Sequence, residues 1–199
     1  MLKSAVFRVA SLLLVVVMVI GCKGKAPKEH TSLAIPPGQD PGKPAKALSM
    51  MWLHHSTGRD ILNGGLLAAL KTNNIKFFDM YYKEGKAADG YVVGDHTDPQ
   101  DLPKAFNTQK YFDIIRKWEL DGDKQHDIVM FKSCFPASNV KDEAMLKKYR
   151  EYYEAMLPTF KKNPDILFIG MSTPPLMKGK TTPENAKRAR TWAKWVTTE

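Results

Sequence analysis

The sequence has few of the residues that build metal centres. Only 2 of its 199 residues are cysteines, Cys22 and Cys134, and they form no Cys-x-x-Cys pair. The histidines include the adjacent pair His54 and His55 but no His-x-His spacing. Adjacent strand residues point to opposite faces, so this pair cannot chelate one ion. We therefore expect no metal site on this pair.

A complete phosphate-binding loop is also missing. Residues 65–72, GLLAALKT, have leucine at position 70, where such a loop needs glycine before its lysine. Asp95, Asp98 and Asp101 could suggest calcium, but the segment from Asp98 to Asp101 has the cap, proline and acid of a helix start. We favour the helix start, and we expect neither a metal nor another cofactor.

Residues 1–21 have the form of a bacterial secretory signal. A basic start precedes an apolar run, residues 11–21, that is too short for a comfortable membrane span. Residues 19–22, VIGC, resemble a lipobox, which implies cleavage before Cys22 and lipid attachment to it. An ordinary signal peptide with a chance cysteine is the alternative. The expected location is the bacterial cell envelope, on its extracytoplasmic side.

Residues 22–47 are expected to tether the lipidated cysteine to one α/β domain, residues 48–199. Residues 23–47 contain five prolines, five lysines and no periodic pattern. The net charge is +9, and a basic tail beside a lipid suits an anionic membrane surface. No nucleic-acid motif accompanies this charge, so we expect no nucleic-acid partner.

Replacing Cys22 with serine is expected to release the protein from membranes, because the lipid attachment site is lost. Detergent phase partitioning of cell fractions measures this release. Cys134→Ser is the matched control and should stay in the detergent phase. Detergent-dependent membrane association of Cys22→Ser would show that something else anchors the chain.

Strand-like and helix-like segments alternate through the domain. Strands are predicted at residues 48–53, 75–82, 127–134 and 166–171, and helices at 60–71, 108–119, 142–162 and from Pro183 onward. Pro158 should kink the third of these helices or start a new turn. This order predicts a doubly wound parallel sheet with helices on both faces. Ligands bind such sheets at the carboxyl ends of the strands.

Two loops at those strand ends carry candidate chemistry. Ser56 follows the first strand, where its own N–H and those of Thr57 and Gly58 could stabilise an oxyanion. The alternative is that Ser56 or Thr57 only caps a helix. Lys132, Ser133 and Asn139 follow the third strand, and Asn139 could also be a helix cap.

The motifs HHSTG (residues 54–58) and FKSCFPASN (residues 131–139) resemble those of the SGNH, or GDSL-type, hydrolases. The resemblance implies a flavodoxin-like fold, Ser56 as nucleophile, and an oxyanion hole formed with Asn139 and a glycine, Gly94 or Gly90. His54 and His55 stand where the family has Gly-Asp, and the usual Gly-x-Asn-Asp context of Asn139 is missing.

The largest departure concerns the catalytic base. The family takes it from an Asp-x-x-His block after a fifth strand, but no histidine follows His126 here. We therefore expect an incomplete domain whose last strand and block lie beyond Glu199. His96 is the best internal substitute, whereas His55 would face away from Ser56. Cys134 is a rival nucleophile.

The sequence thus predicts a membrane-tethered ester hydrolase or acyl transferase that acts on envelope or extracellular esters of carbohydrates or lipids. The binding crevice would be lined by five polar residues: His54, His55, His96, Lys132 and Ser133. The alternative is a non-catalytic envelope lipoprotein that binds a glycan or a protein partner through the same crevice.

Overall fold

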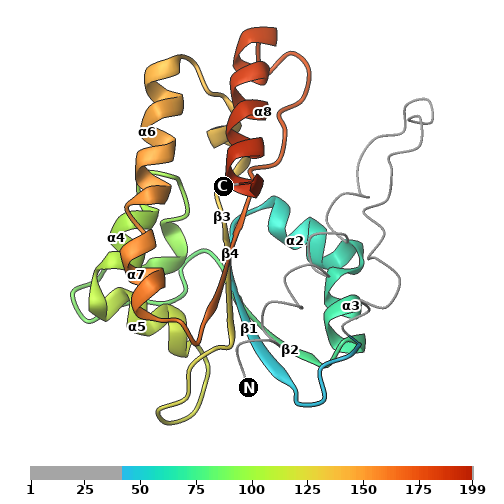
Figure 1. The fold of residues 1–199 in the computed structure, drawn as a ribbon, viewed down its shortest axis with the longest axis vertical. Helices are drawn as coiled ribbons and strands as arrows, with labels where there is room; N and C mark the ends of the chain where they lie inside the picture. Colours follow the sequence, from blue (N-terminus) through green and yellow to red (C-terminus); the bar gives the residue numbers. More distant parts are fainter. Residues whose placement is uncertain (1–41, 199) are drawn as a thin grey trace.

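A computed structural model describes residues 42–198, so the predicted signal peptide, Cys22 and most of the predicted tether lie outside the described residues. Its sheet has four parallel strands in the order β2-β1-β3-β4 (Figure 1). The strands are β1 (Leu48–Leu53), β2 (Ile75–Met80), β3 (Ile128–Lys132) and β4 (Leu167–Met171). The predicted α/β fold with a parallel sheet is confirmed, and the strand order is compatible with a flavodoxin-like fold.

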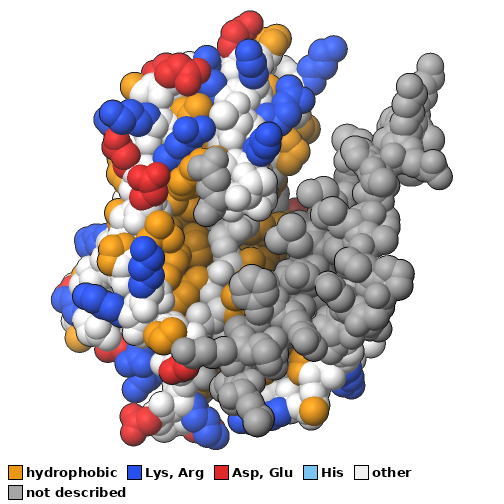
Figure 2. All heavy atoms as spheres, viewed as in Figure 1, with side chains coloured by type: hydrophobic (Ala, Val, Ile, Leu, Met, Phe, Trp, Pro, Cys, Tyr) orange, Lys and Arg blue, Asp and Glu red, His pale blue; other side chains and the backbone are white. Residues whose placement is uncertain are grey.

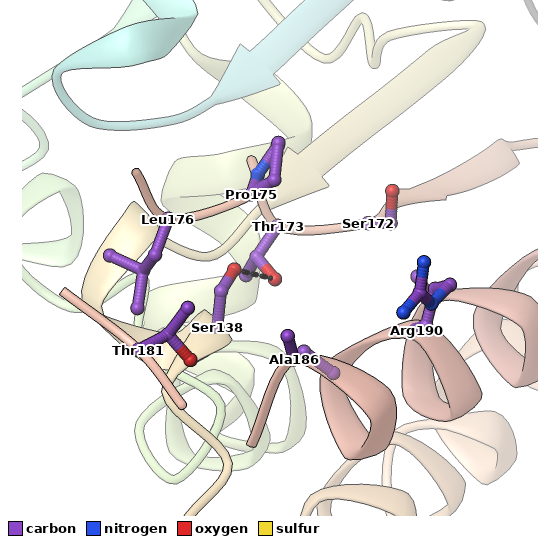
Figure 3. A pocket seen from close by; sticks show the side chains of 10 residues that line it. Ser138, Ser172, Thr173, Pro175, Leu176, Thr181, Ala186 and Arg190 are labelled. Carbon is purple, nitrogen blue, oxygen red and sulfur yellow. Dashed lines mark hydrogen bonds between the residues drawn. The ribbon is translucent and has the colours of Figure 1, made fainter. Parts of the chain in front are cut away.

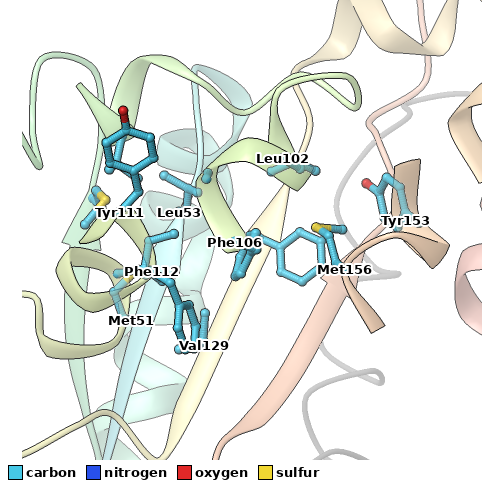
Figure 4. Close-up of a cluster of buried hydrophobic side chains, with 14 of the residues drawn as sticks. Met51, Leu53, Leu102, Phe106, Tyr111, Phe112, Val129, Tyr153 and Met156 are labelled. Carbon is cyan, nitrogen blue, oxygen red and sulfur yellow. The ribbon is translucent and has the colours of Figure 1, made fainter. Parts of the chain in front are cut away.

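Helices cover both faces of the sheet because successive strand residues point to opposite sides. Met50, Trp52 and Met130 pack under the first helical segment, which consists of α2 (Thr57–Ile61), the π-helical turn η1 (Leu62–Leu66) and α3 (Leu67–Thr72). Met51, Leu53 and Phe131 face the other cluster (Figure 4). The helices on that side are α4 (Leu102–Asn107), α5 (Gln109–Lys117), α6 (Glu143–Glu154), α7 (Leu157–Lys162) and α8 (Pro183–Thr198).

Two strands end earlier than predicted. β2 stops at Met80 rather than at residue 82, because the Glu84 carboxylate accepts the N–H of Tyr81 at 2.6 Å and turns the chain. β3 ends at Lys132 rather than at residue 134, since the chain enters a 3-10 turn, η3 (Phe135–Ser138), almost at once. Both corrections move polar residues from strand ends into loops.

The first predicted helix, 60–71, begins earlier, at Thr57, and is interrupted at Gly65, whose φ is 120°. The helix start predicted at Asp98 is also wrong. The carbonyl of Asp98 accepts the N–H groups of Asp101 and Leu102, which makes a turn, and α4 begins only at Leu102. Local sequence placed the cap one turn too early.

The break predicted at Pro158 is confirmed, because α6 ends at Glu154 and Pro158 lies in the first turn of α7. Asp142 caps α6 by accepting the N–H of Met145 at 2.7 Å, so Asn139 is not the cap. Pro183 begins α8 as predicted. Within residues 42–198, no helix combines the length and apolar character needed to cross a bilayer.

Candidate functional site

The carboxyl ends of β1 and β3 form the candidate site. After β1 the chain crosses to β2 on one side, and after β2 it crosses to β3 on the other side of β1. Strand order therefore reverses between β1 and β3, which is where doubly wound sheets bind ligands. Ser56 follows β1, and Lys132 ends β3.

Ser56 has a strained backbone, with φ 41° and ψ −101°. A positive φ is rare for residues other than glycine, and such outliers gather at functional sites. Ser56 stands at the N-cap position of α2, but its side chain makes no capping hydrogen bond. Capping therefore does not explain this serine.

Three polar groups near Ser56 lack partners. Among the described residues, none accepts a hydrogen bond from the N–H of Ser56 or of Thr57. The Thr57 hydroxyl is buried and also unpaired, so Thr57 is not a side-chain cap either. N–H groups at the start of a helix have no intrahelical acceptor, whereas an unpaired buried hydroxyl such as that of Thr57 is uncommon in folded proteins. A bound oxyanion or hydroxyl would satisfy these donors.

His54 is fully buried between β1, β2 and α2. Its Nε2 lies 2.7 Å from Oδ1 of Asp79 in an ion-pair contact that lacks hydrogen-bond alignment. Its ring also packs on Trp52, with centroids 4.4 Å apart. A Cβ on Gly58 would lie 2.2 Å from Nδ1 of His54, so only glycine fits beside this ring. His54 is thus a buried support for the Ser56 turn.

His55 is directed toward the loop after β2. Its Nε2 contacts the carbonyl oxygen of Gly94, and its ring stacks on Tyr82 with centroids 3.7 Å apart. Burial lowers the pKa of His55, and the Gly94 carbonyl opposes this shift. His55 is therefore neutral at pH 7, and its Nε2–H donates to Gly94.

Gly94 occupies a position that excludes any side chain. A Cβ there would lie 1.9 Å from the backbone oxygen of Tyr81. The N–H of Gly94 donates to the carbonyl of Glu84 at 3.0 Å, so it is already used. Gly94 holds His55 and the β2 loop together, while Gly90 has φ 86° and open space around it.

Lys132 is fully buried and joins the two strand ends. Its Nζ donates to the carbonyl of His55 at 3.1 Å and to that of Ser133 at 3.3 Å. Burial lowers the pKa of Lys132 to about 8, and the neighbouring Cys134 and Asp60 oppose the shift. The lysine thus binds the peptide that precedes Ser56.

Cys134 is buried and is the one free thiol among the described residues. It lies beside Tyr82, whose pKa is raised to about 12 by burial first and by Cys134 second. It also lies close enough to Lys132 to oppose the fall in the pKa of that lysine. Cys134 therefore belongs to the same cluster as His55 and Lys132.

Ser133 and Asn139 point away from this cluster. The Ser133 hydroxyl lies 3.5 Å from that of Tyr153 in the core below α6. The side-chain oxygen of Asn139 accepts from Asn185 of α8 at 2.9 Å. The structure shows no contact between Asn139 and the Ser56 turn.

The remaining described histidines do not reach Ser56 either. His96 stacks on Tyr91, with centroids 4.2 Å apart and an interplanar angle of 4°. His126 precedes β3 at the amino end of that strand, which is the end of the sheet opposite to Ser56. Burial lowers the pKa of His126 to about 4. Its Nε2 lies 2.9 Å from the carbonyl of Trp118. Neither ring is placed as a base for this serine.

A cavity of about 320 Å³ lies at the carboxyl end of β4, below α8. Figure 3 shows Ser138 and Thr173, whose hydroxyls are 2.7 Å apart, between Leu176 on one side and Arg190 on the other. The exposed Arg190 guanidinium has no partner among the described residues. Figure 2 shows further Lys and Arg side chains over α8, with Asp and Glu side chains also present at this end of the molecule.

The sequence alone missed Asp79 and Tyr82 as parts of the site. Tyr82 was expected inside the second strand, and Asp79 was treated as an ordinary strand residue. Their one sequence signal was their place at the carboxyl end of an apolar strand, which is where sites gather.

No metal site is visible among the described residues: no group of three or more His, Cys, Asp or Glu side chains is placed to hold an ion. Comparison of the chain with protein-family models, with curated proteins and with solved structures found no match.

Proposed function

We propose that the chain is an SGNH-type serine hydrolase that performs ester hydrolysis or acyl transfer through Ser56. The observation that carries the proposal is the strained backbone of Ser56 at the carboxyl end of β1. A serine on a sharp strand-to-helix turn exposes its hydroxyl at the edge of the sheet. The surrounding fold must hold this strain, and His54, Gly58 and Lys132 are the contacts that do so.

The unpaired donors beside Ser56 fit the same chemistry. Attack on an ester carbonyl places negative charge on its oxygen, and nearby N–H groups stabilise that charge in the transition state. The N–H groups of Ser56 and Thr57 are free among the described residues to do this. In this arrangement Gly94 supports the loop rather than donating its N–H, which Glu84 already accepts.

The nucleophile also needs a base. Among the described histidines, His54 is paired with Asp79 and His55 with the Gly94 carbonyl. The SGNH resemblance implies an Asp-x-x-His base after a fifth strand, and no histidine follows His126 in these 199 residues. We further propose a lipid-anchored enzyme of the bacterial envelope that acts on carbohydrate or lipid esters.

Labelling with a fluorophosphonate probe tests the assignment directly. The complete gene product should form one covalent adduct, located on Ser56 by peptide mass spectrometry, because activated serines attack phosphorus. Ser172→Ala is the matched control, since Ser172 follows β4 at the same edge of the sheet. It should label like the wild type. An adduct on another residue, or none, would contradict the proposal.

The second candidate is a non-catalytic protein that binds a glycan through the same crevice. The observation in its favour is Tyr82, which is 39% exposed and stacks on His55 beside the Ser56 turn. Exposed aromatic rings present an apolar face to a ligand and a polar tip to water. Glycan binding that survives in Ser56→Ala, without any probe adduct, would favour this candidate.

A further inference from the structure

We propose that Lys132 is a positioning residue whose ammonium group holds and polarises the His55–Ser56 peptide and thereby makes the Ser56 N–H an oxyanion donor. The inference rests on the proposed role of Ser56. It goes further by naming the group that prepares the donor and by predicting how pH controls it.

The geometry begins with one carbonyl oxygen. The oxygen of His55 accepts from Lys132 Nζ at 3.1 Å and from the N–H of Gly58 at 3.0 Å. The peptide is trans, so its carbonyl and its N–H point in opposite directions. Because the oxygen is held toward the buried lysine, the Ser56 N–H is turned to the other side, where no described residue accepts it.

Charge adds to this orientation. A cation that donates to a peptide oxygen draws electron density toward it, which makes the N–H of the same peptide a stronger donor. Lys132 is fully buried, so solvent screens this effect little. The lysine contacts the peptide rather than the reacting atoms, and its role is therefore indirect.

The charge on Lys132 depends on pH within a useful range. Burial lowers the pKa of Lys132 to about 8, so the ammonium loses its proton as pH rises past that value. Three titratable or charged groups face it: Cys134, Asp60 and His55. His55 is already neutral there, because burial lowers its pKa. The Ser56 N–H should thus become a weaker hydrogen-bond donor as pH rises above about 8.

Carbon-detected NMR tests the contact without any need for activity. The only His-Ser step in the chain is His55–Ser56, so labelling with [1-¹³C]histidine and [¹⁵N]serine marks this peptide alone. Its carbonyl shift should titrate with a midpoint near the pKa of about 8 in the wild type and stay flat in Lys132→Met. Thiols also titrate in this range, so the titration must persist in Cys134→Ser. A flat wild-type shift would overturn the proposal.

Kinetics then test the consequence. Lys132→Met should lower kcat/KM at pH 7 about tenfold, less than the roughly 10²–10³ lost with a whole oxyanion donor. It should also abolish the alkaline fall in rate near pH 8. Its Tm should not fall, because Gly58 still bonds the carbonyl and no charge stays buried. The exposed Lys141→Met is the matched control and should behave as the wild type.

The outcomes separate the two proposals. A titrating carbonyl in a protein without esterase activity would support the Lys132 contact and reject Ser56 as nucleophile. An active enzyme whose alkaline fall persists in Lys132→Met would support Ser56 and reject the role of Lys132. If Lys132→Met lowered Tm clearly, and its rate fell only because less of the enzyme was folded, Lys132 would be a structural residue and its positioning role would be rejected.

Discussion

Ser56→Ala is expected to lower kcat/KM of the complete gene product for p-nitrophenyl acetate at least ~100-fold, the scale of losing a nucleophile that acts as a unit with its base. The N–H donors stay in place, so slow residual hydrolysis should remain. Alanine at φ 41° is no more strained than serine, so the fold should be kept. Circular dichroism checks the fold, and initial rates across substrate concentrations give kcat/KM.

Ser172→Ala is again the control for a serine at a strand end, and its rate should stay within about twofold of the wild type. Full activity in Ser56→Ala would remove Ser56 from the mechanism. Cys134→Ser then tests the rival nucleophile. If Cys134 were the nucleophile, Cys134→Ser would lose activity while Ser56→Ala kept it.

Gly94→Ala is expected to destabilise the domain by about 3 kcal/mol or more, at the upper end of overpacking effects. The added Cβ would lie 1.9 Å from the backbone oxygen of Tyr81, and backbone cannot rotate aside as a side chain can. Relief requires the β2 loop to move, which would disturb the Glu84 hydrogen bond and the His55 contact. Urea denaturation followed by circular dichroism measures the loss.

Gly170→Ala is the matched control. It lies on β4, and an added Cβ would meet the Phe131 ring at 3.4 Å, which is ordinary contact. Its unfolding free energy should change by less than about 1 kcal/mol, because alanine is also less flexible than glycine in the unfolded chain. Similar urea midpoints for Gly94→Ala and Gly170→Ala would show that the loop around Gly94 accommodates the added Cβ at little cost, which would contradict the prediction.

Much of the fold follows from local sequence. Largely apolar runs located β1, β3 and β4, because strands covered by helices on both faces need no polar alternation, whereas the edge strand β2 also contains Lys76 and Asp79. Pro158 and Pro183 marked helix boundaries correctly, since proline lacks the N–H that a helix interior requires. The errors came where a side chain or a turn intervened: Glu84 ended β2, and the Asp98 turn delayed α4.

The candidate site was predictable only in part. The serine after the first strand and the polar Lys132 loop were visible, because they interrupt apolar runs where a sheet binds ligands. The partners of these residues were not visible. Asn139 was expected beside Ser56 but pairs with Asn185, which is 46 positions along the chain.

By itself, then, the sequence determined which segments are strands, which are helices, and which loops gather at one edge of the sheet. Only the tertiary structure decided the backbone angles of Ser56, the crowding at Gly94 and the bond from Lys132 to the carbonyl of His55. The spacing of apolar residues along the chain predicts which side chains are buried, and this pattern can be recognised from neighbouring residues alone. Lys132 and His55 are 77 positions apart, and their contact exists only because β1 and β3 pair side by side.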